Sequence, residues 1–204
     1  MKISIISGSH RHNSQSEKVA RHIEKTLIDE NTADQAWLYS LAGNPLPLWD
    51  EEVWNKSKAW ETLLKPLRKE LIDSDGFVFI APEYHGQVPA GLKNFFLLFG
   101  KYELGHKPAM IVTVSSGDGG SYPVAELRMS SYKNSRVCYI PDHVIVRNVE
   151  SVLNENPKDN DASADAYFRE RIDWNLRLLV EYAKALKSVR ESGLAFHDKF
   201  GNGM

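Results

Sequence analysis

Residues able to bind a phosphate group gather near the start of the chain, at positions 8–16. Three serine hydroxyls there donate hydrogen bonds, and the planar guanidinium of Arg11 suits a phosphate. The loop follows an apolar run at residues 2–7 and precedes a helical pattern near Glu17, whose positive end would face it. The helix dipole offers only roughly 0.3–1 kcal/mol, so hydrogen bonds must supply most of the affinity. Because serine is also an ordinary N-cap, phosphate binding and helix capping both stay open for this loop alone.

Two further loops place small and polar residues directly after apolar runs. They contain Pro82, Glu83, Tyr84, His85 and Gly86 after residues 77–81, and Ser115, Ser116 and Gly117 after residues 109–114. Glycine permits backbone conformations and close approaches that other residues do not, so Gly86 and Gly117 would let the backbone lie against a flat ligand.

Apolar periodicity predicts five strands that alternate with helices. The strands are expected at residues 2–7, 36–41, 77–81, 109–115 and 143–147, and the helices at 17–28, 60–72, after Pro89, at 124–129 and at 166–189. Pro66 either kinks the second helix or starts a new turn. Residues 150–165 are polar and rich in helix breakers, which indicates a surface loop, and residues 193–204 are expected to form a mobile tail.

This alternation predicts an α/β fold, a flavodoxin-like doubly wound five-stranded parallel sheet with helices on both faces. The 204 residues suffice for one core, so a single domain over residues 1–204 is expected. In such sheets the ligand lies beyond the carboxyl ends of the strands, at the switch point between the first and third strands. The loops after strands one, three and four should therefore meet there.

Composition argues against several classes of protein. The 25 basic and 27 acidic residues are dispersed and leave a formal charge of −2, so no basic stripe suggests nucleic acid as a partner. The single cysteine, Cys138, excludes an internal disulfide framework and a CxxC pair. A strand is expected directly at residues 2–7, so no leader is expected, and no apolar run is long enough for a bilayer. We expect a cytoplasmic protein with no membrane partner.

Other possible motifs carry less weight. His10 and His12 resemble a metal pair but lack a third ligand nearby in sequence, so no metal site is expected. Asp142 and His143 suggest a catalytic dyad, yet no Gly-x-Ser-x-Gly elbow accompanies them. Neither a Walker A motif nor Gly-x-Gly-x-x-Gly occurs. Trp49 is interpreted as a packing anchor, although a loop Trp could also cover a flat ligand.

Taken together, the motifs of strands one to four resemble the NADPH-dependent FMN reductase family, flavodoxin-like flavoproteins that include quinone, azo-dye and chromate reductases. The matching segments are residues 8–14, 46–50, 82–86 with Pro89, 92–94 and 115–120. A Gly-Ser-x-Arg loop is a weak signal by itself, but Pro-Glu-Tyr-x-Gly and Leu-Lys-Asn at the right distance make it a strong one. Residues from 142 onward match only in outline.

The resemblance implies a bound FMN and gives each loop a role. The phosphate would be held by Ser9, Arg11, Ser14 and Ser16, with Gln15 in the same loop. One side of the flavin ring would lie along Pro82, Glu83, Tyr84, His85 and Gly86. The other side would face Ser115, Ser116 and Gly117. Two positions depart from the family, which more often has Asn where this chain has His85 and Ser16. The resemblance also implies dimers. An apolar-aromatic cluster is therefore expected to serve a homodimer or homotetramer as well as helix packing; it consists of Tyr84, Phe95, Phe96, Leu97, Leu98, Phe99 and Tyr102.

The chemistry needs no catalytic residue of the protein, because a flavin carries out hydride and electron transfer itself. The sequence thus predicts an FMN-dependent NAD(P)H oxidoreductase that uses NADPH or NADH and reduces a small acceptor such as a free flavin, quinone, azo compound or metal oxyanion. Two alternatives remain open: a non-catalytic FMN protein that carries electrons or senses redox state, and a flavodoxin-like domain for another phosphorylated ligand.

Overall fold

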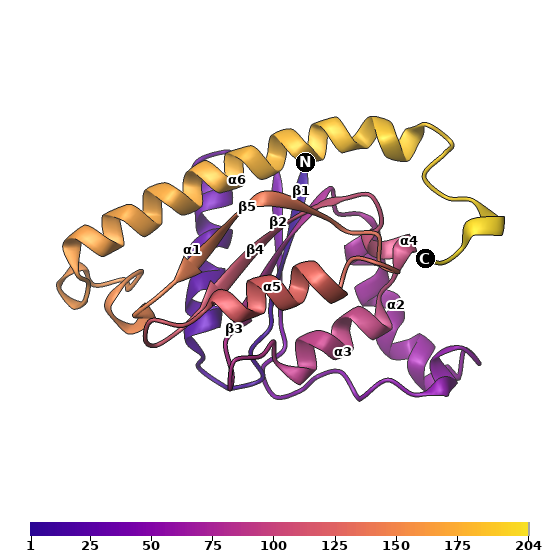
Figure 1. Ribbon diagram of the computed structural model, residues 1–204, viewed down its shortest axis with the longest axis horizontal. Helices are drawn as coiled ribbons and strands as arrows, with labels where there is room; N and C mark the ends of the chain where they lie inside the picture. The colour runs from indigo at the N-terminus through magenta and orange to yellow at the C-terminus, as the bar shows by residue number, and fades with distance from the viewer. Residues whose placement is uncertain (204) are drawn as a thin grey trace.

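A parallel sheet lies at the centre of the structure, a computed structural model that describes residues 1–203 (Figure 1). Its strands are β1 (Lys2–Ser7), β2 (Gln35–Ser40), β3 (Gly76–Pro82), β4 (Pro108–Val114) and β5 (Cys138–Val146), in the order β2-β1-β3-β4-β5. All four neighbouring pairs are parallel. This order confirms the predicted flavodoxin-like sheet, with β1 and β3 adjacent at the switch point.

Helices cover both faces of the sheet. They are α1 (Gln15–Asp29), α2 (Lys58–Ile72), α3 (Ala90–Leu98), α4 (Lys101–Leu104), α5 (Ser121–Ser130) and α6 (Ala162–Glu191). Short 3-10 turns lie at Glu51–Val53, Val149–Ser151, Pro157–Asp159 and Asp198–Phe200. Helix α2 runs through Pro66 as one element. At about 1.5 Å per residue, the 30 residues of α6 extend over roughly 45 Å.

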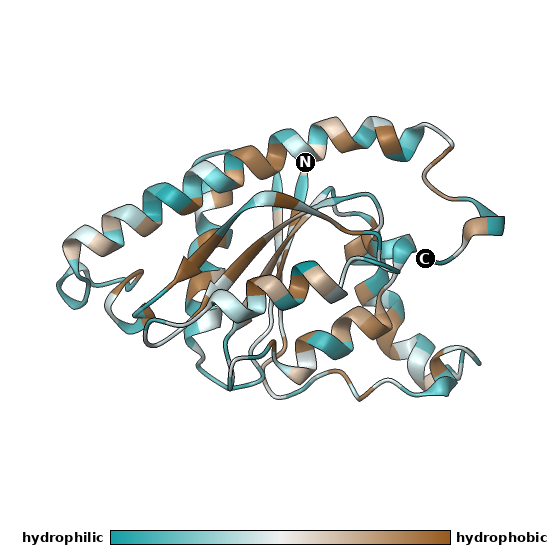
Figure 2. Ribbon diagram, in the orientation of Figure 1, coloured by the Kyte–Doolittle hydropathy of each residue, from teal (hydrophilic) through white to brown (hydrophobic). Residues whose placement is uncertain are grey.

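Two apolar clusters, one on each face, hold the layers together. Ile5 and Val78 point towards α1 and α6, whereas Phe79 points to the opposite face, where residues of α2, α3 and α5 cover it. Every residue of β3 and β4 is buried, as a parallel strand between two helical layers requires. Figure 2 shows these strands as apolar ribbons between helices of mixed character. Burying one such side chain stabilises the fold by about 1.5–3 kcal/mol.

Strand β5 begins five residues earlier than the sequence predicts. The expectation of a start at residue 143, beyond Pro141, is wrong because β5 includes this proline. Ala109 pairs with Tyr139, but Ile111 pairs with His143, so β5 bulges between these pairs. At an edge strand a bulge accommodates proline without the loss of a ladder hydrogen bond.

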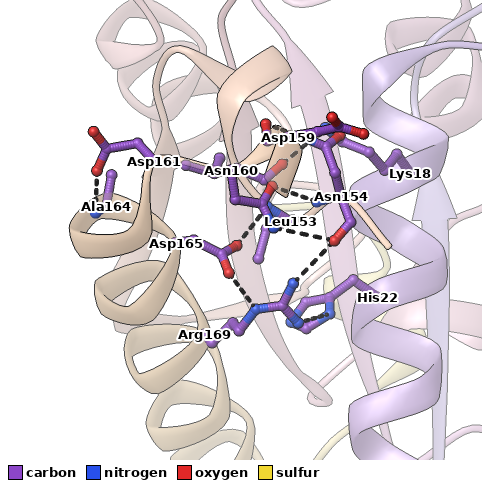
Figure 3. A network of polar contacts seen from close by, with 11 residues as sticks. Lys18, His22, Leu153, Asn154, Asp159, Asn160, Asp161, Ala164, Asp165 and Arg169 are labelled. Carbon is purple, nitrogen blue, oxygen red and sulfur yellow. Dashed lines mark hydrogen bonds and ion pairs between the residues drawn. The ribbon is translucent and has the colours of Figure 1, made fainter. Parts of the chain in front are cut away.

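The expected surface loop at residues 150–165 is also only partly correct. Helix α6 begins at Ala162, four residues before the prediction, because Asp161 caps it by accepting a hydrogen bond from the Ala164 N–H at 2.8 Å. Val152 and Leu153 are buried in the core of the α1 face. Figure 3 shows the polar network around this segment, which joins α1 to α6.

The last part of the chain folds back onto the loop before β5. Arg136 donates to the carbonyls of Ala195 and Phe200, and Lys101 Nζ donates to the Gly201 carbonyl at 2.6 Å. The mobility expected for residues 193–204 stays a prediction, and Met204 lies outside the described residues. Among residues 1–203, no helix combines the length and apolar content that a membrane span needs. A cytoplasmic location and the absence of a nucleic-acid partner also stay predictions.

Candidate functional site

Three loops meet at the carboxyl edge of the sheet, as the strand order requires. They follow β1 (residues 8–14), β3 (residues 83–89) and β4 (residues 115–120), and these strands are neighbours in the sheet (Figure 1). The parallel arrangement places all three at the same edge. The structure therefore brings together every loop that carries a predicted site residue.

The first loop passes very close to the rest of the sheet at Gly8. Its N–H donates to the Ile80 carbonyl at 2.8 Å, and a Cβ at this position would lie only 2.6 Å from that oxygen and 2.8 Å from a Leu92 methyl. Only glycine fits there without displacing the backbone. This contact aligns the start of the loop with β3 and the helix that follows it.

The loop ends by presenting the N-terminus of α1 to the same edge. Asn13 has a φ of 50°, and Ser14 caps the helix by accepting from the Glu17 N–H at 3.1 Å. Among residues 1–203, the N–H groups of residues 13–16 have no hydrogen-bond acceptor. Free N–H groups at the positive end of a helix are the chemistry that binds phosphate.

The side chains at this edge differ in how exposed they are. Arg11 is exposed, and within the described residues its guanidinium has no hydrogen-bond or ion-pair partner. Ser14 keeps 8% of its surface and Ser16 only 1%. The Gln15 Oε1 atom is buried and has no hydrogen-bond partner in the described part of the chain. A phosphate that lies against the N-terminus of α1 would thus meet the Arg11 charge and the Ser14 hydroxyl most easily.

The second loop is a tight turn whose backbone conformation limits the residue types that fit. Tyr84 and Gln87 exchange backbone hydrogen bonds of 3.1 and 3.0 Å, and the two residues between them have positive φ, 51° at His85 and 73° at Gly86. Two consecutive positive φ values define a type I′ turn. Asn, Asp and His are the non-glycine residues that tolerate this region best, so His85 can replace the more frequent Asn without loss of the turn.

The side chain of Tyr84 connects the second loop to the first. Its hydroxyl lies 2.8 Å from Ser9 Oγ, and the His10 ring packs edge-on against it with centroids 5.5 Å apart. Ser9 Oγ also accepts from the Arg11 N–H at 3.2 Å. Two loops predicted to bind different parts of one ligand are thus joined directly.

Glu83 connects the second loop to the third. Its Oε2 accepts from the Gly120 N–H at 2.6 Å, and a Cβ on Gly119 would lie 3.0 Å from its other oxygen. Gly120 has a φ of 102°, and a Cβ there would come within 2.5 Å of Ile145. The carboxylate therefore orders the glycine-rich loop, a role that the sequence alone did not indicate for Glu83.

The third loop is open to solvent at its tip and held at its base by residues after β5. Ser116 and Gly117 are exposed, while Ser115 Oγ accepts from the Gly117 N–H at 3.2 Å. Asn148 donates from its backbone to the Gly117 carbonyl, and Arg147 donates to the Gly119 carbonyl at 3.1 Å. Neither supporting residue was predicted from the sequence, although their position directly after the fifth strand places them at this edge.

The loop before α2 is held at the α3 side of the site by Asn94. This buried amide accepts from the Trp49 N–H and donates to the Pro47 carbonyl, each at 2.8 Å. Trp49 is half-buried against the core of the α2 and α3 face and packs on Trp54 with centroids 4.8 Å apart. These contacts agree with its interpretation as a packing anchor.

Comparison with known proteins identifies the family to which this arrangement belongs. The sequence profile of the NADPH-dependent FMN reductases matches residues 1–151, which contain all three loops. The chain belongs to this family. The predicted resemblance is therefore confirmed.

Curated relatives agree in class. A quinone reductase from Pseudomonas putida is 30% identical over 124 residues, 59% of this chain and 63% of the relative, so the match leaves more than a third of that protein uncovered. Another quinone reductase from the same species is 27% identical over 166 residues, 78% of this chain and 84% of the relative. An NAD(P)H-dependent FMN reductase from Schizosaccharomyces pombe is 31% identical over 128 residues, covering 58% of this chain and 60% of that protein.

Solved structures support the fold. A flavoenzyme NAD(P)H:(acceptor) oxidoreductase from Paracoccus denitrificans superimposes with a TM-score of 0.68 at 19% identity, over 90% of this chain and 97% of that one. An oxidoreductase from Corynebacterium diphtheriae gives 0.66 at 15% identity, with the same coverage. At these identities the similarity concerns the fold alone.

Proposed function

We propose that this protein uses bound FMN to pass reducing equivalents from NADPH or NADH to a small acceptor. The first candidates for the acceptor are a quinone and a free flavin, and azo compounds and metal oxyanions are further candidates. The observation that carries the proposal is the convergence of the three loops on one edge, where the N-terminus of α1 offers N–H groups without acceptors. When bound, FMN supplies the hydride and electron transfer chemistry. The protein's own task is to bind and orient it.

The proposed binding residues divide between the two ends of the cofactor. Arg11, Ser14 and Ser16, with backbone N–H groups of the first loop and Gln15 beside them, would hold the phosphate. Residues 82–86 and 115–117 would lie on the two sides of the ring. Support comes from the exposed Arg11 charge, from the rigid turn at His85 and Gly86, and from the exposed Ser116 and Gly117.

A homodimer or homotetramer is part of the proposal. In the second apolar cluster Phe95 and Phe99 are buried, which agrees with helix packing, but Leu97 is 64% exposed and Tyr102 67%. On neighbouring α5, Met129 is 76% exposed. Exposed apolar side chains on adjacent helices are typical of a subunit contact.

The deciding experiment is a visible spectrum of the purified protein with FMN, recorded before and after anaerobic addition of NADPH and then NADH. Bleaching of the flavin band and its return on addition of a quinone are the expected result. A bound flavin that neither nucleotide reduces would favour an electron carrier or redox sensor. Failure to bind FMN at all would leave a domain for another phosphorylated ligand.

A further inference from the structure

Lys18, near the start of α1, reaches across to the segment that follows β5 (Figure 3). Its ammonium group donates to the carbonyls of Val149 and Val152 at 2.6 and 2.8 Å and to the Asn154 side chain at 2.8 Å. These three bonds use all of its protons. The side chain is half-buried. Lys18 is therefore bound to this segment and does not serve as a solvated surface charge.

The segment begins with a short 3-10 turn, Val149–Ser151, that depends on this lysine for part of its support. The last backbone bond of the turn, from the Val152 N–H to the Val149 carbonyl, measures 3.5 Å, which is long for a hydrogen bond. Among residues 1–203, Lys18 is the one donor to the Val152 carbonyl. Lys18 thus binds two carbonyls that the backbone of the turn holds weakly or leaves without a partner.

The same turn supports the third loop of the site. The Asn148 N–H donates to the Gly117 carbonyl, and the Val149 N–H donates to the Ser115 carbonyl, each at 3.2 Å. Val149 is fully buried, so it has little freedom to move away from these partners. Its N–H holds the third loop and its carbonyl is held by Lys18. This one residue therefore connects the third loop to α1.

We propose that Lys18 is a positioning residue for the flavin, although it makes no contact with it. By fixing the third loop to α1, it sets residues 115–117, on one side of the ring, relative to the phosphate at the N-terminus of α1. A loop that is held in place before the ligand arrives costs less to order on binding. The inference rests on the proposed FMN site and adds to it a residue from outside the three loops.

The first test needs no flavin. Amide hydrogen exchange is followed by NMR in the wild type, Lys18→Met and Lys107→Met; methionine keeps an unbranched apolar chain but removes the three donors. Lys107 is the matched control because its ammonium also donates to three backbone carbonyls, those of Leu71, Ile72 and Glu103, at 2.8 to 2.9 Å. It lies directly before β4, at the edge of the sheet opposite the third loop.

Exchange at the turn should respond to Lys18 alone. The amides of Asn148 and Val149 should exchange about tenfold faster in Lys18→Met than in the wild type, beyond any change shared by the whole protein. In Lys107→Met these two amides should change only as much as the core amides do. An equal acceleration of all amides in Lys18→Met would mean that Lys18 contributes only to global stability, and the proposal would be wrong.

The second test measures the flavin. Fluorescence titration compares FMN with riboflavin, which lacks the phosphate. Lys18→Met should weaken both by the same factor, about two- to tenfold, because the displaced loop faces the ring that both ligands share. The visible band of bound FMN should shift as well. Lys107→Met should leave the affinities and the band unchanged.

A milder variant keeps the test decisive if Lys18→Met does not fold, which thermal melting without flavin would reveal. Asn154→Ala removes one of the three acceptors of Lys18 and should produce smaller changes of the same kind in exchange, affinity and spectrum.

Wild-type flavin affinities and an unshifted band in folded Lys18→Met would overturn the proposal and leave the flavin site intact. A wild-type protein that binds neither flavin would instead remove the proposed function. The exchange experiment would then still show whether Lys18 holds the third loop.

Discussion

At the scale of single residues, the site depends on backbone conformation as much as on side-chain chemistry. Gly8 is fixed by the approach of the Ile80 carbonyl, and Gly86 by a positive φ in the turn. His85 shares that turn and keeps it because its side chain tolerates the left-handed region. The exposed Arg11 guanidinium, in contrast, has no hydrogen-bond or ion-pair partner among residues 1–203.

Arg11→Ala should weaken FMN binding by about 1.5–3 kcal/mol, since a charge-assisted hydrogen bond to the phosphate is lost. Fluorescence titration with FMN measures the loss. Lys25→Ala, which removes an exposed cation farther along α1, is the control and should change the affinity little. Equal affinities for the Arg11 and Lys25 variants would show that Arg11 does not reach the phosphate.

His85→Val should destabilise the protein by about 1–2 kcal/mol, because a β-branched residue is strained at a φ of 51°. The free energy of unfolding in urea measures this cost. His85→Asn, the control, should keep both the stability and the FMN content of the wild type. If the Val and Asn variants were equally stable, the left-handed conformation at this position would be refuted.

At the scale of elements, the start of α6 is joined to α1 by a polar network (Figure 3). Asp165 accepts from the Leu153 N–H at 2.6 Å and from Arg169 at 2.8 Å, and Arg169 lies beside His22 of α1. Burial, with the nearby Arg169 charge, lowers the pKa of His22 to about 4. The junction therefore contains a neutral histidine at physiological pH.

This burial of His22 predicts a pH dependence of stability with a definite sign. Between pH 6.5 and about 4 the unfolded chain binds a proton at His22 that the folded protein does not, so stability falls as the pH falls through this range. The loss should reach about 2–3 kcal/mol by pH 4. Above pH 6.5 the contribution is fully present.

Urea unfolding of the wild type and of His22→Gln at several pH values isolates this effect from the carboxylates, which titrate in both proteins. The wild type should lose about 2–3 kcal/mol more than the variant between pH 7 and pH 4. The exposed loop residue His12 provides the control substitution, His12→Gln, which should follow the wild type. Parallel curves for all three proteins would contradict the buried neutral histidine.

At the scale of the whole molecule, the layer formed by α3 and α5 leaves large apolar side chains exposed. Leu97 of α3 and Met129 of α5 lie on the same side of the sheet, and both are largely exposed. The groove between these helices measures about 320 Å³ and is lined by Phe96, Leu97 and Leu127, with the Lys93–Glu126 ion pair at its side. This layer is the proposed subunit contact.

Leu97→Glu should shift the protein towards monomers, because a carboxylate in an apolar contact would have to be desolvated. Analytical ultracentrifugation across a wide range of concentrations gives the mass. Tyr167→Glu, an equally exposed position on α6 of the opposite layer, should leave the mass unchanged. A monomeric wild type at all concentrations would remove the proposed oligomer.

Much of the fold follows from local sequence patterns, and for this reason it could be predicted from the sequence. The apolar runs of β1, β3 and β4 and the helical spacing of α1 depend only on neighbouring residues, and the strand–helix alternation then favours one sheet order. Since parallel strands end at one edge, the meeting of the three loops follows as well. The phosphate-binding role proposed for residues 8–16 was predicted from local patterns in the same way.

Contacts between residues far apart in sequence were decided only by the tertiary structure. The bulge that admits Pro141 depends on pairing with β4, and the early start of α6 depends on buried Leu153 and the Asp161 cap. Most of all, the 2.8 Å bond between Ser9 and Tyr84 joins positions 75 residues apart. Both hydroxyls could bind a ligand by their chemical type, and the sequence gives no sign that they lie against each other.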